Sequence, residues 1–178
     1  MGVIVNNLID DANFAMKGDC TARRGHQLIS AMGNVVTRTS RPIVARAMHP
    51  DTRYYFGPDH IFNGKTFESV AAIWESQIYM PFAPGVPEGN RATEPPVTVP
   101  GYTVKPAADV EEWVLATAGA RPADRDPVDA RVVNDVKDGT GTIIASQEDV
   151  GGWPELEENR RELELPATGR GLPRRTST

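Results

Sequence analysis

Three segments of similar pattern recur at nearly constant spacing in the first third of the chain, and this repeat constrains the fold most. Their anchor residues are Asn7, Asn34 and His60, which lie 27 and 26 residues apart. In each copy the anchor precedes two large apolar residues: Leu8 and Ile9, Val35 and Val36, Ile61 and Phe62. Repeats of 20–50 residues that are built from short strands are typical of a solenoid.

Stacking explains why such a unit would repeat. One copy cannot bury its apolar side chains alone, whereas copies stacked at the ~4.8 Å strand spacing align them in columns. We expect the first apolar residue of each copy in one column and the second in a neighbouring one. Adjacent side chains of a straight strand point to opposite faces, so a corner is expected at the anchor. Asparagine suits a corner because it tolerates the left-handed conformation and its amide can bond to the next coil. The alternative is an antiparallel meander with chance similarity.

The rest of the chain divides by composition. A second apolar segment follows each copy, at 14–16, 43–45 and 70–73, so residues 1–80 form the predicted β-helix coils. Seven of the 15 prolines lie within 81–106, and we expect an extended connector there because proline lacks an N–H and fixes φ. Residues 107–154 form a predicted helical extension packed on the coils. Residues 155–178 are charged and aperiodic, which predicts a mobile tail.

Two helices are marked within the extension. The first is predicted at about 107–118, where Val110, Trp113 and Val114 form one apolar stripe, so Trp113 is expected in the core. The second should begin at the Asp126 cap and end at Gly139. We expect both helices to cover an apolar face of the coils, and residues 142–145 to form a short strand.

Charge and composition exclude several classes of function. The formal net charge of -5 and the pI of about 5.2 argue against general nucleic-acid binding, which needs a basic face. No apolar run approaches the ~18 residues that span a bilayer, so no membrane partner is expected. The N-terminal segment lacks the pattern of a signal peptide. We therefore expect either a cytoplasmic chain or a fragment of a longer, secreted protein.

Arg41 and Arg46 are weak candidates for catalytic residues. They flank an Ile-Val pair, and two guanidinium groups beside a strand could clamp a carboxylate through bidentate hydrogen bonds. Arginine beside anionic sugars could also act as a base if its pKa were depressed. The alternative is a pair of solvated turn arginines beside buried apolar residues.

Two other clusters are candidates for binding, one for calcium and one for an acidic polymer, and each could instead be an ordinary surface turn. Asp10 and Asp11 offer the hard oxygen ligands that calcium prefers, but adjacent strand residues point opposite ways, and solvated turn aspartates are the alternative. Arg23, Arg24 and His26 form a small basic loop that could meet an acidic polymer, or a plain surface turn. His60, at the corner of the third copy, is expected to be structural.

Several stretches resemble bacterial pectate lyases. Residues 6–9, 32–36 and 41–57 are similar to the late coils of those enzymes. Residues 114–133, Gly-Thr-Gly-Thr-Ile-Ile at 139–144 and Val-Gly-Gly-Trp-Pro at 150–154 are similar to the segment that closes their β-helix. The resemblance covers about residues 3–154 and is most specific from 114 onward.

The resemblance implies a mainly β fold: a right-handed parallel β-helix of about three coils, truncated on the N-terminal side, with a small C-terminal helical extension. It also implies secretion, polygalacturonate as partner, and calcium-assisted β-elimination in which an arginine takes the C5 proton. The family's motif Arg-x-Pro-x-x-Arg lies on earlier coils with the calcium aspartates. Here the nearest string runs from Arg41 to Arg46 with the proline shifted and the spacing changed, so no catalytic role is transferred to either.

Two functions follow as hypotheses. The chain is a pectate lyase-like protein that lacks the catalytic coils, or a non-catalytic β-helix remnant that at most binds acidic polysaccharide weakly. A coil stack that begins at Val3 would expose an unpaired sheet end. We therefore expect another β-helix segment as a partner at that end.

Overall fold

The computed structural model describes residues 1–20, 25–80 and 85–153, in two compact units, 1–141 and 142 onward. The strands of the first unit are β1 (Gly2–Val5), β2 (Leu8–Asp10), β3 (Met16–Cys20), β4 (Leu28–Met32), β5 (Val35–Thr37), β6 (Ile43–Ala47), β7 (Arg53–Phe56), β8 (Ile61–Phe62) and β9 (Ile78–Tyr79). Its helices are α1 (Val70–Ser76), η1 (Glu88–Asn90), α2 (Ala107–Thr117) and α3 (Pro127–Asp138). The second unit contains the 3₁₀ helix η2 (Gln147–Val150).

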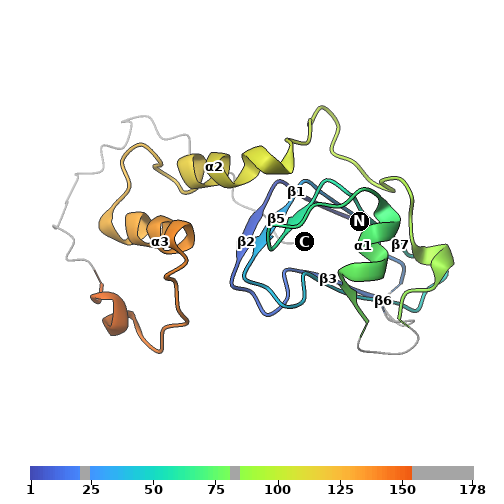
Figure 1. Ribbon diagram of the computed structural model, residues 1–178, viewed down its shortest axis with the longest axis horizontal. Helices are drawn as coiled ribbons and strands as arrows, with labels where there is room; N and C mark the ends of the chain where they lie inside the picture. The colour runs from blue at the N-terminus through green and yellow to red at the C-terminus, as the bar shows by residue number, and fades with distance from the viewer. Residues whose placement is uncertain (21–24, 81–84, 154–178) are drawn as a thin grey trace, which may run out of the picture. The chain divides into compact units, whose positions relative to one another are not determined.

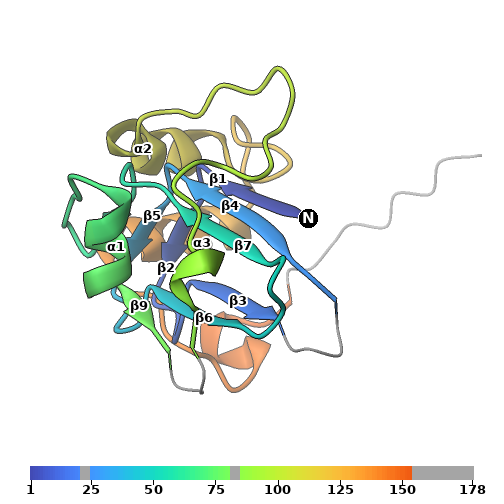
Figure 2. The ribbon, with the colours of Figure 1, turned by 90° about the vertical axis from the view of Figure 1, so that its right-hand side faces the viewer.

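The strands form three parallel sheets of three strands each (Figures 1 and 2). Sheet A has the order β1-β4-β7, sheet B β2-β5-β8 and sheet C β3-β6-β9. The chain therefore enters the three sheets in turn, three times, and we call each run of three strands a coil. All six pairings between these strands are parallel, which confirms the predicted parallel arrangement; the antiparallel meander is wrong.

The register of sheet B matches the columns expected from the repeat. Leu8 pairs with Val35, and Val35 pairs with Ile61. The second column, Ile9 with Val36 and Val36 with Phe62, points into the core, where Val36 and Phe62 are fully buried. Complete burial of a side chain of this size contributes roughly 1.5–3 kcal/mol, so the inner column favours this register strongly.

The outer column of sheet B is covered by a helix. Val110 of α2 is fully buried and packs with Ala107 and Val35, while Leu8 and Ile61 lie partly buried at the edge of this cluster. Figure 1 shows α2 beside β2 and β5, the strands that it contacts. Two adjacent apolar columns are therefore buried on opposite faces of one sheet.

The corner before sheet B is held by a chain of hydrogen bonds from coil to coil. The backbone N–H of Asn7 donates to Asn34 Oδ1 at 3.0 Å, and the backbone N–H of Asn34 donates to His60 Nδ1 at 3.0 Å. Asn34 Nδ2 also donates to the Ile4 carbonyl at 2.9 Å. The three anchors thus form a ladder in which each higher side chain accepts from the backbone of the coil below.

The left-handed conformation lies one residue earlier than expected, at Asn6 (φ 51°) and Gly33 (φ 58°). Asn6 is buried and joins the connector to the coils, because its Oδ1 accepts from Lys105 N and its Nδ2 donates to the carbonyl oxygens of Gly33 and Lys105. A Cβ atom at Gly33 would lie 2.9 Å from the Lys105 carbonyl oxygen. Gly33 is therefore required both for its φ and for the close approach of the connector.

Three sequence-based expectations are wrong. Residues 70–73 form the start of α1, because Ser69 caps a helix there and its hydroxyl accepts from Ala72 N; the strand of the third coil is β9. Residues 142–145 form no strand, and Ile143 is 98% exposed. Trp113 is 40% exposed because its ring lies beside the Lys105 ammonium, 5.0 Å from the centroid, instead of in the core.

The structure also bears on two predicted segments in part. Only 85–106 and 107–153 of the connector and extension are described, and the predicted tail at 155–178 lies outside the described residues.

Of the helices in the described part of the chain, none is both long and apolar enough to cross a membrane.

The ladder makes stability depend on pH through His60. The side chain is buried, and burial lowers its pKa from 6.5 to about 4, against the opposing effect of the Asp59 charge. The unfolded chain binds the proton at His60 more readily than the folded chain does. We therefore expect the contribution of neutral His60 to the free energy of unfolding to be fully present above pH 6.5. It should fall by roughly 3 kcal/mol as the pH drops from 6.5 to 4.

The substitution His60→Asn isolates this effect, because asparagine offers an acceptor where Asn34 already uses one in the coil below. Urea unfolding at several pH values should show a much flatter pH dependence for this variant. The exposed His26→Asn variant should keep the wild-type slope. An unchanged slope in His60→Asn would contradict the role of the ladder histidine.

Candidate functional site

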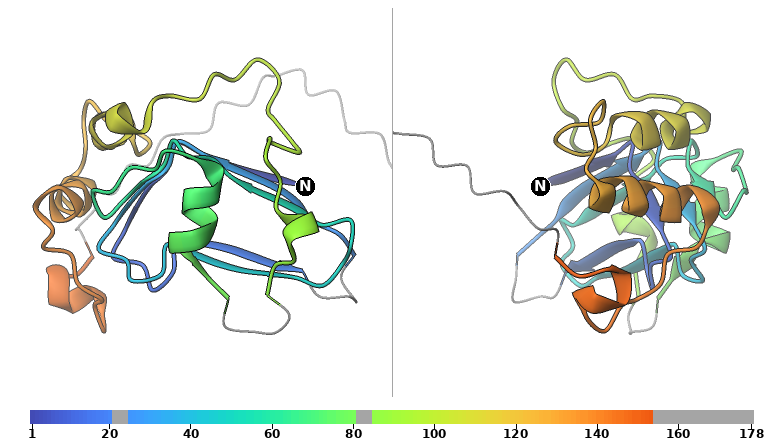
Figure 3. Two further views of the ribbon diagram at one scale, coloured as in Figure 1. Left: turned by 45° about the vertical axis from the view of Figure 1, so that its right-hand side comes forward. Right: turned by 90° about the vertical axis from the view of Figure 1, so that its left-hand side faces the viewer.

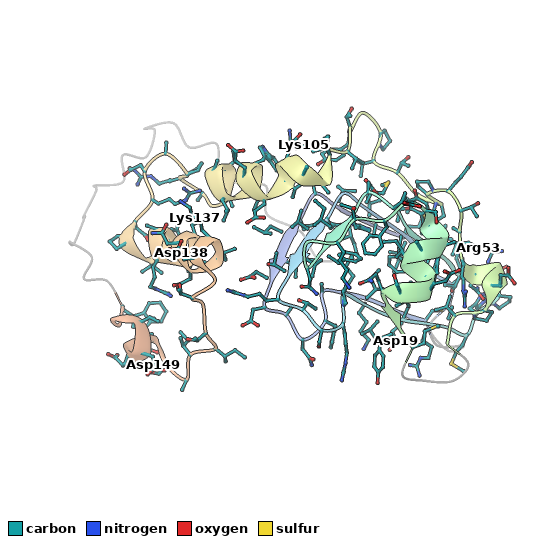
Figure 4. All side chains as sticks on the ribbon, viewed as in Figure 1. Asp19, Arg53, Lys105, Lys137, Asp138 and Asp149 are labelled. Atoms are coloured by element: carbon teal, nitrogen blue, oxygen red, sulfur yellow. The ribbon has the colours of Figure 1, made fainter. Side chains whose placement is uncertain are left out.

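The outer face of sheet C is the charged face of the coils. Strand alternation buries Met16, Gly18 and Cys20 of β3 on the inside, and it leaves Lys17 exposed and Asp19 partly exposed outside. On the same face Arg46 of β6 is partly exposed and Tyr79 of β9 is 44% exposed. Figure 4 shows Asp19 pointing away from the strands. These side chains are therefore accessible to solvent.

Asp19 and Arg46 form a cross-strand ion pair on this face. They are direct partners in the register of β3 and β6, and Arg46 donates to Asp19 Oδ1 from Nε at 2.9 Å and from Nη2 at 2.7 Å. Lys17 Nζ lies 3.5 Å from the other carboxylate oxygen. Burial tends to raise the pKa of Asp19, but the hydrogen bond and charge of Arg46, aided by Lys17, lower it overall. Asp19 is therefore an ionised partner of these cations at neutral pH.

Arg41 lines a separate polar hollow beside the start of β6. Its guanidinium lies 4.7 Å from the centre of the Tyr79 ring, in a cation–π contact. The hollow measures about 390 Å³ and is lined by Thr39, Ser40, Arg41, Pro42, Asn63, Lys65, Ser76, Gln77, Ile78 and Tyr79. Its charged lining residues, Arg41 and Lys65, are both basic. The chemistry of this hollow suits an anion that also carries hydroxyl groups.

The structure gives the two predicted arginines different positions and different partners. Arg41 precedes β6 and contacts Tyr79, whereas Arg46 lies within β6 and is bound to Asp19. The two guanidinium groups therefore do not converge on one carboxylate. They could instead meet successive groups of a longer polymer.

Asp10 and Asp11 do not converge on one point. Asp10 accepts from Thr37 Oγ1 at 2.6 Å and pairs with Arg38, whereas Asp11 is exposed at a left-handed turn residue (φ 49°). Within the described ranges, no three His, Cys, Asp or Glu side chains are grouped so that they could hold a metal ion.

The predicted basic loop is described only in part. Arg23 and Arg24 lie outside the described residues, and His26 is exposed with its ring centre 5.8 Å from that of His49. His49 in turn lies 3.9 Å from Asp51. Of the predicted basic loop, the structure therefore describes only His26, which lies near another histidine.

Sequence reasoning missed the partners of both arginines. The repeat offers a signal for one of them, because an offset of 27 residues from Asp19 leads to Arg46. Tyr79 and Lys65 had no such signal, because α1 interrupts the third coil and shifts its last strand.

The ion pair on sheet C leads to a modest, testable effect. Removing one charge with Asp19→Asn should lower the free energy of unfolding at pH 7 by less than about 1 kcal/mol, as is usual for exposed pairs. Because the folded pKa of Asp19 is lowered, this contribution is present at neutral pH and is lost as the pH falls through that pKa.

Urea unfolding in low and high salt measures the effect, and Asp51→Asn serves as a matched control on an exposed carboxylate. The wild type should lose its advantage over Asp19→Asn in high salt, whereas Asp51→Asn should match the wild type throughout. An Asp19→Asn variant that is more stable than the wild type at pH 7 would contradict the assignment.

Comparisons with protein-family models, with curated proteins and with solved structures found no match for this chain.

Proposed function

We propose that this chain is a pectate lyase-like, right-handed parallel β-helix that binds an acidic polysaccharide in the hollow at Arg41 and along the neighbouring outer face of sheet C. The β-helix proposal is supported by the order in which the chain enters the three sheets and by the stacked columns of sheet B. The kinship with secreted enzymes that act on polygalacturonate is supported by the resemblance at 114–154 alone.

The hollow at Arg41 and Lys65 is the observation that carries the binding proposal. The chain as a whole has a net charge of -5, yet the charged residues lining this hollow are both basic. A basic hollow on an acidic protein favours a negatively charged ligand and disfavours a neutral one. Lys17 and Arg46 extend the basic character along sheet C, with Asp19 as their carboxylate partner.

A uronate polymer fits the types of group that are present. Its carboxylate would accept hydrogen bonds from the Arg41 guanidinium, in competition with the cation–π contact to Tyr79. Its hydroxyl groups would exchange hydrogen bonds with the side chains of Ser40, which is exposed, and Gln77, which is partly exposed. The apolar face of a sugar ring would pack on the exposed ring of Tyr79.

Calcium-assisted β-elimination is the second candidate, supported by the resemblance and by the parallel sheets. In that reaction calcium would neutralise the uronate carboxylate and acidify the proton at C5. Two of the carboxylates on the strands are occupied otherwise, since Asp19 is bound by Arg46 and Asp10 by Arg38. Binding without elimination therefore accounts better for the side chains of this chain.

Binding to polygalacturonate, measured by affinity electrophoresis or calorimetry, tests the proposal. We expect affinity that falls with salt concentration and a loss of roughly tenfold or more in Arg41→Gln and in Lys65→Gln, since about 1.4 kcal/mol corresponds to tenfold. Arg121→Gln is the matched control, because Arg121 is largely exposed and remote in sequence from the hollow. A neutral galactan should bind far more weakly.

Equal binding of the neutral polymer, or full affinity in Arg41→Gln, would overturn the proposal. Ultraviolet absorbance of an unsaturated uronide product separates the two candidate functions in the same samples. If the full chain forms this product with calcium, and a chelator abolishes its formation, calcium-assisted β-elimination is established in place of binding alone.

A further inference from the structure

A second cavity lies at the end of the stack that the third coil forms. Its lining comes from α1 and from the segment around η1, and both elements contact β7, the edge strand of sheet A. The left view of Figure 3 shows α1 and η1 in front of the strands. The cavity measures about 290 Å³ and is lined by Val70, Ala71, Trp74, Glu75, Glu88, Arg91, Ala92 and Thr93. It shares no lining residue with the hollow at Arg41.

Trp74 gives this cavity a fixed wall. The Ser69 cap begins α1, and the helix brings Ile73 and Trp74 into the core, where the Trp74 and Phe56 rings lie 5.3 Å apart between centroids. Trp74 is only 6% exposed. Because a close-packed core resists changes of rotamer, the ring keeps its place beside the cavity.

Arg91 is held against this wall. Its Cζ atom lies 5.2 Å from the centre of the Trp74 ring in a cation–π contact, and its Nε donates to the carbonyl oxygen of the buried Val86 at 3.1 Å. The next residue, Ala92, donates its backbone N–H to the Tyr54 carbonyl oxygen at 2.9 Å. The guanidinium is therefore preorganised, so a ligand that it binds would cost it little further side-chain freedom.

The Nη groups of Arg91 have no protein partner. Within residues 1–20, 25–80 and 85–153, neither Nη atom donates a hydrogen bond and no carboxylate forms an ion pair with this guanidinium. By contrast, Arg38, Arg46, Arg121 and Arg131 each pair with an aspartate. Two Nη groups in one plane match the two oxygens of a carboxylate, so Arg91 offers a bidentate contact to such a ligand.

Two exposed carboxylates restrict what that ligand can be. Glu75 and Glu88 both line the cavity, but neither pairs with Arg91. With two carboxylates and one guanidinium the lining is net negative, which disfavours a phosphate or another multiply charged anion. It favours a carboxylate that has an ammonium group close by. The aliphatic side chains of Val70 and Ala71 offer an apolar contact to the rest of the ligand.

We infer that this cavity binds a free α-amino acid with an apolar side chain. The carboxylate of the amino acid would accept from the Nη groups of Arg91, and its ammonium group would face Glu75 and Glu88. Its side chain would pack on Val70 and Ala71. A cavity of about 290 Å³ is at the lower end of the range for ligand sites, which suits one amino acid better than a peptide. The inference is independent of polysaccharide binding.

Calorimetric titration of the full chain with L-leucine tests the inference. Leucinamide lacks the carboxylate and 4-methylpentanoate lacks the ammonium group, so each should bind roughly tenfold or more weakly than leucine. N-acetyl-leucine, which imitates the end of a peptide, should also bind weakly. Glu75→Gln should weaken leucine binding several-fold, whereas the matched control Glu111→Gln, an exposed change on α2, should bind leucine like the wild type.

Amide and indole NMR spectra locate the bound leucine. The indole N–H resonance of Trp74, assigned with Trp74→Phe, should shift during the titration, and that of Trp113 should not. Arg91→Lys keeps the charge but loses the bidentate contact, so its affinity for leucine should fall roughly tenfold, with the amide spectrum showing that the variant is folded.

Three results would overturn the inference. The first is the absence of heat and of a Trp74 shift with leucine at up to about 10 mM, which is weaker than the affinities of specific sites. The second is binding of leucinamide or 4-methylpentanoate as tight as that of leucine. The third is equal binding of N-acetyl-leucine, which would make a peptide terminus the ligand. Arg41→Gln should leave leucine binding unchanged, so this inference and polysaccharide binding fail separately.

Discussion

The arrangement of strands depends on one corner interaction that is repeated from coil to coil. In the second and third coils, a side chain accepts a hydrogen bond from a backbone N–H of the coil below. Asn34 accepts from the N–H of Asn7, and His60 accepts from the N–H of Asn34. A buried N–H left without a partner costs about 1–3 kcal/mol, so a shift of register by one residue is strongly disfavoured. The same shift would also turn the Val36 and Phe62 column toward α2 and expose the interior.

The histidine rung shows how far such a ladder tolerates a change of residue. Imidazole replaces the amide as acceptor and stacks on Phe62 with ring centres 5.0 Å apart. Its Nε2 is buried without a hydrogen-bond partner in the described part of the chain. The histidine thus adds an aromatic contact to the third coil but leaves one buried nitrogen without a hydrogen bond. Its lowered pKa also makes the stability of this coil depend on pH.

The sequence was most informative where the repeat was regular. The pairing of Leu8, Val35 and Ile61 could be predicted because all three copies keep the order of anchor and two apolar residues. The third coil could be predicted less well, since Ser69 caps a helix and β9 lies beyond it at Ile78. The left-handed residue was misplaced by one position because both asparagines of the first corner are compatible with it, and only Asn6 adopts it.

The candidate site could be predicted only in part for the same reason. Arg46 and Asp19 lie one repeat apart, so the spacing contains their contact. The hollow around Arg41 depends on Tyr79 and Lys65, which the irregular third coil brings to its rim. The basic character of the hollow could not be predicted from composition, because a net charge of -5 does not show where the basic residues lie.

Methyl and amide NOEs measured on the labelled full chain test the stacked register most directly. We expect contacts from Leu8 to Val35 and from Val35 to Ile61, with separate contacts from Ile9 to Val36 and from Val36 to Phe62. Contacts that link Leu8 with Val36 in place of Val35, or short Hα–Hα contacts typical of antiparallel strands, would contradict it.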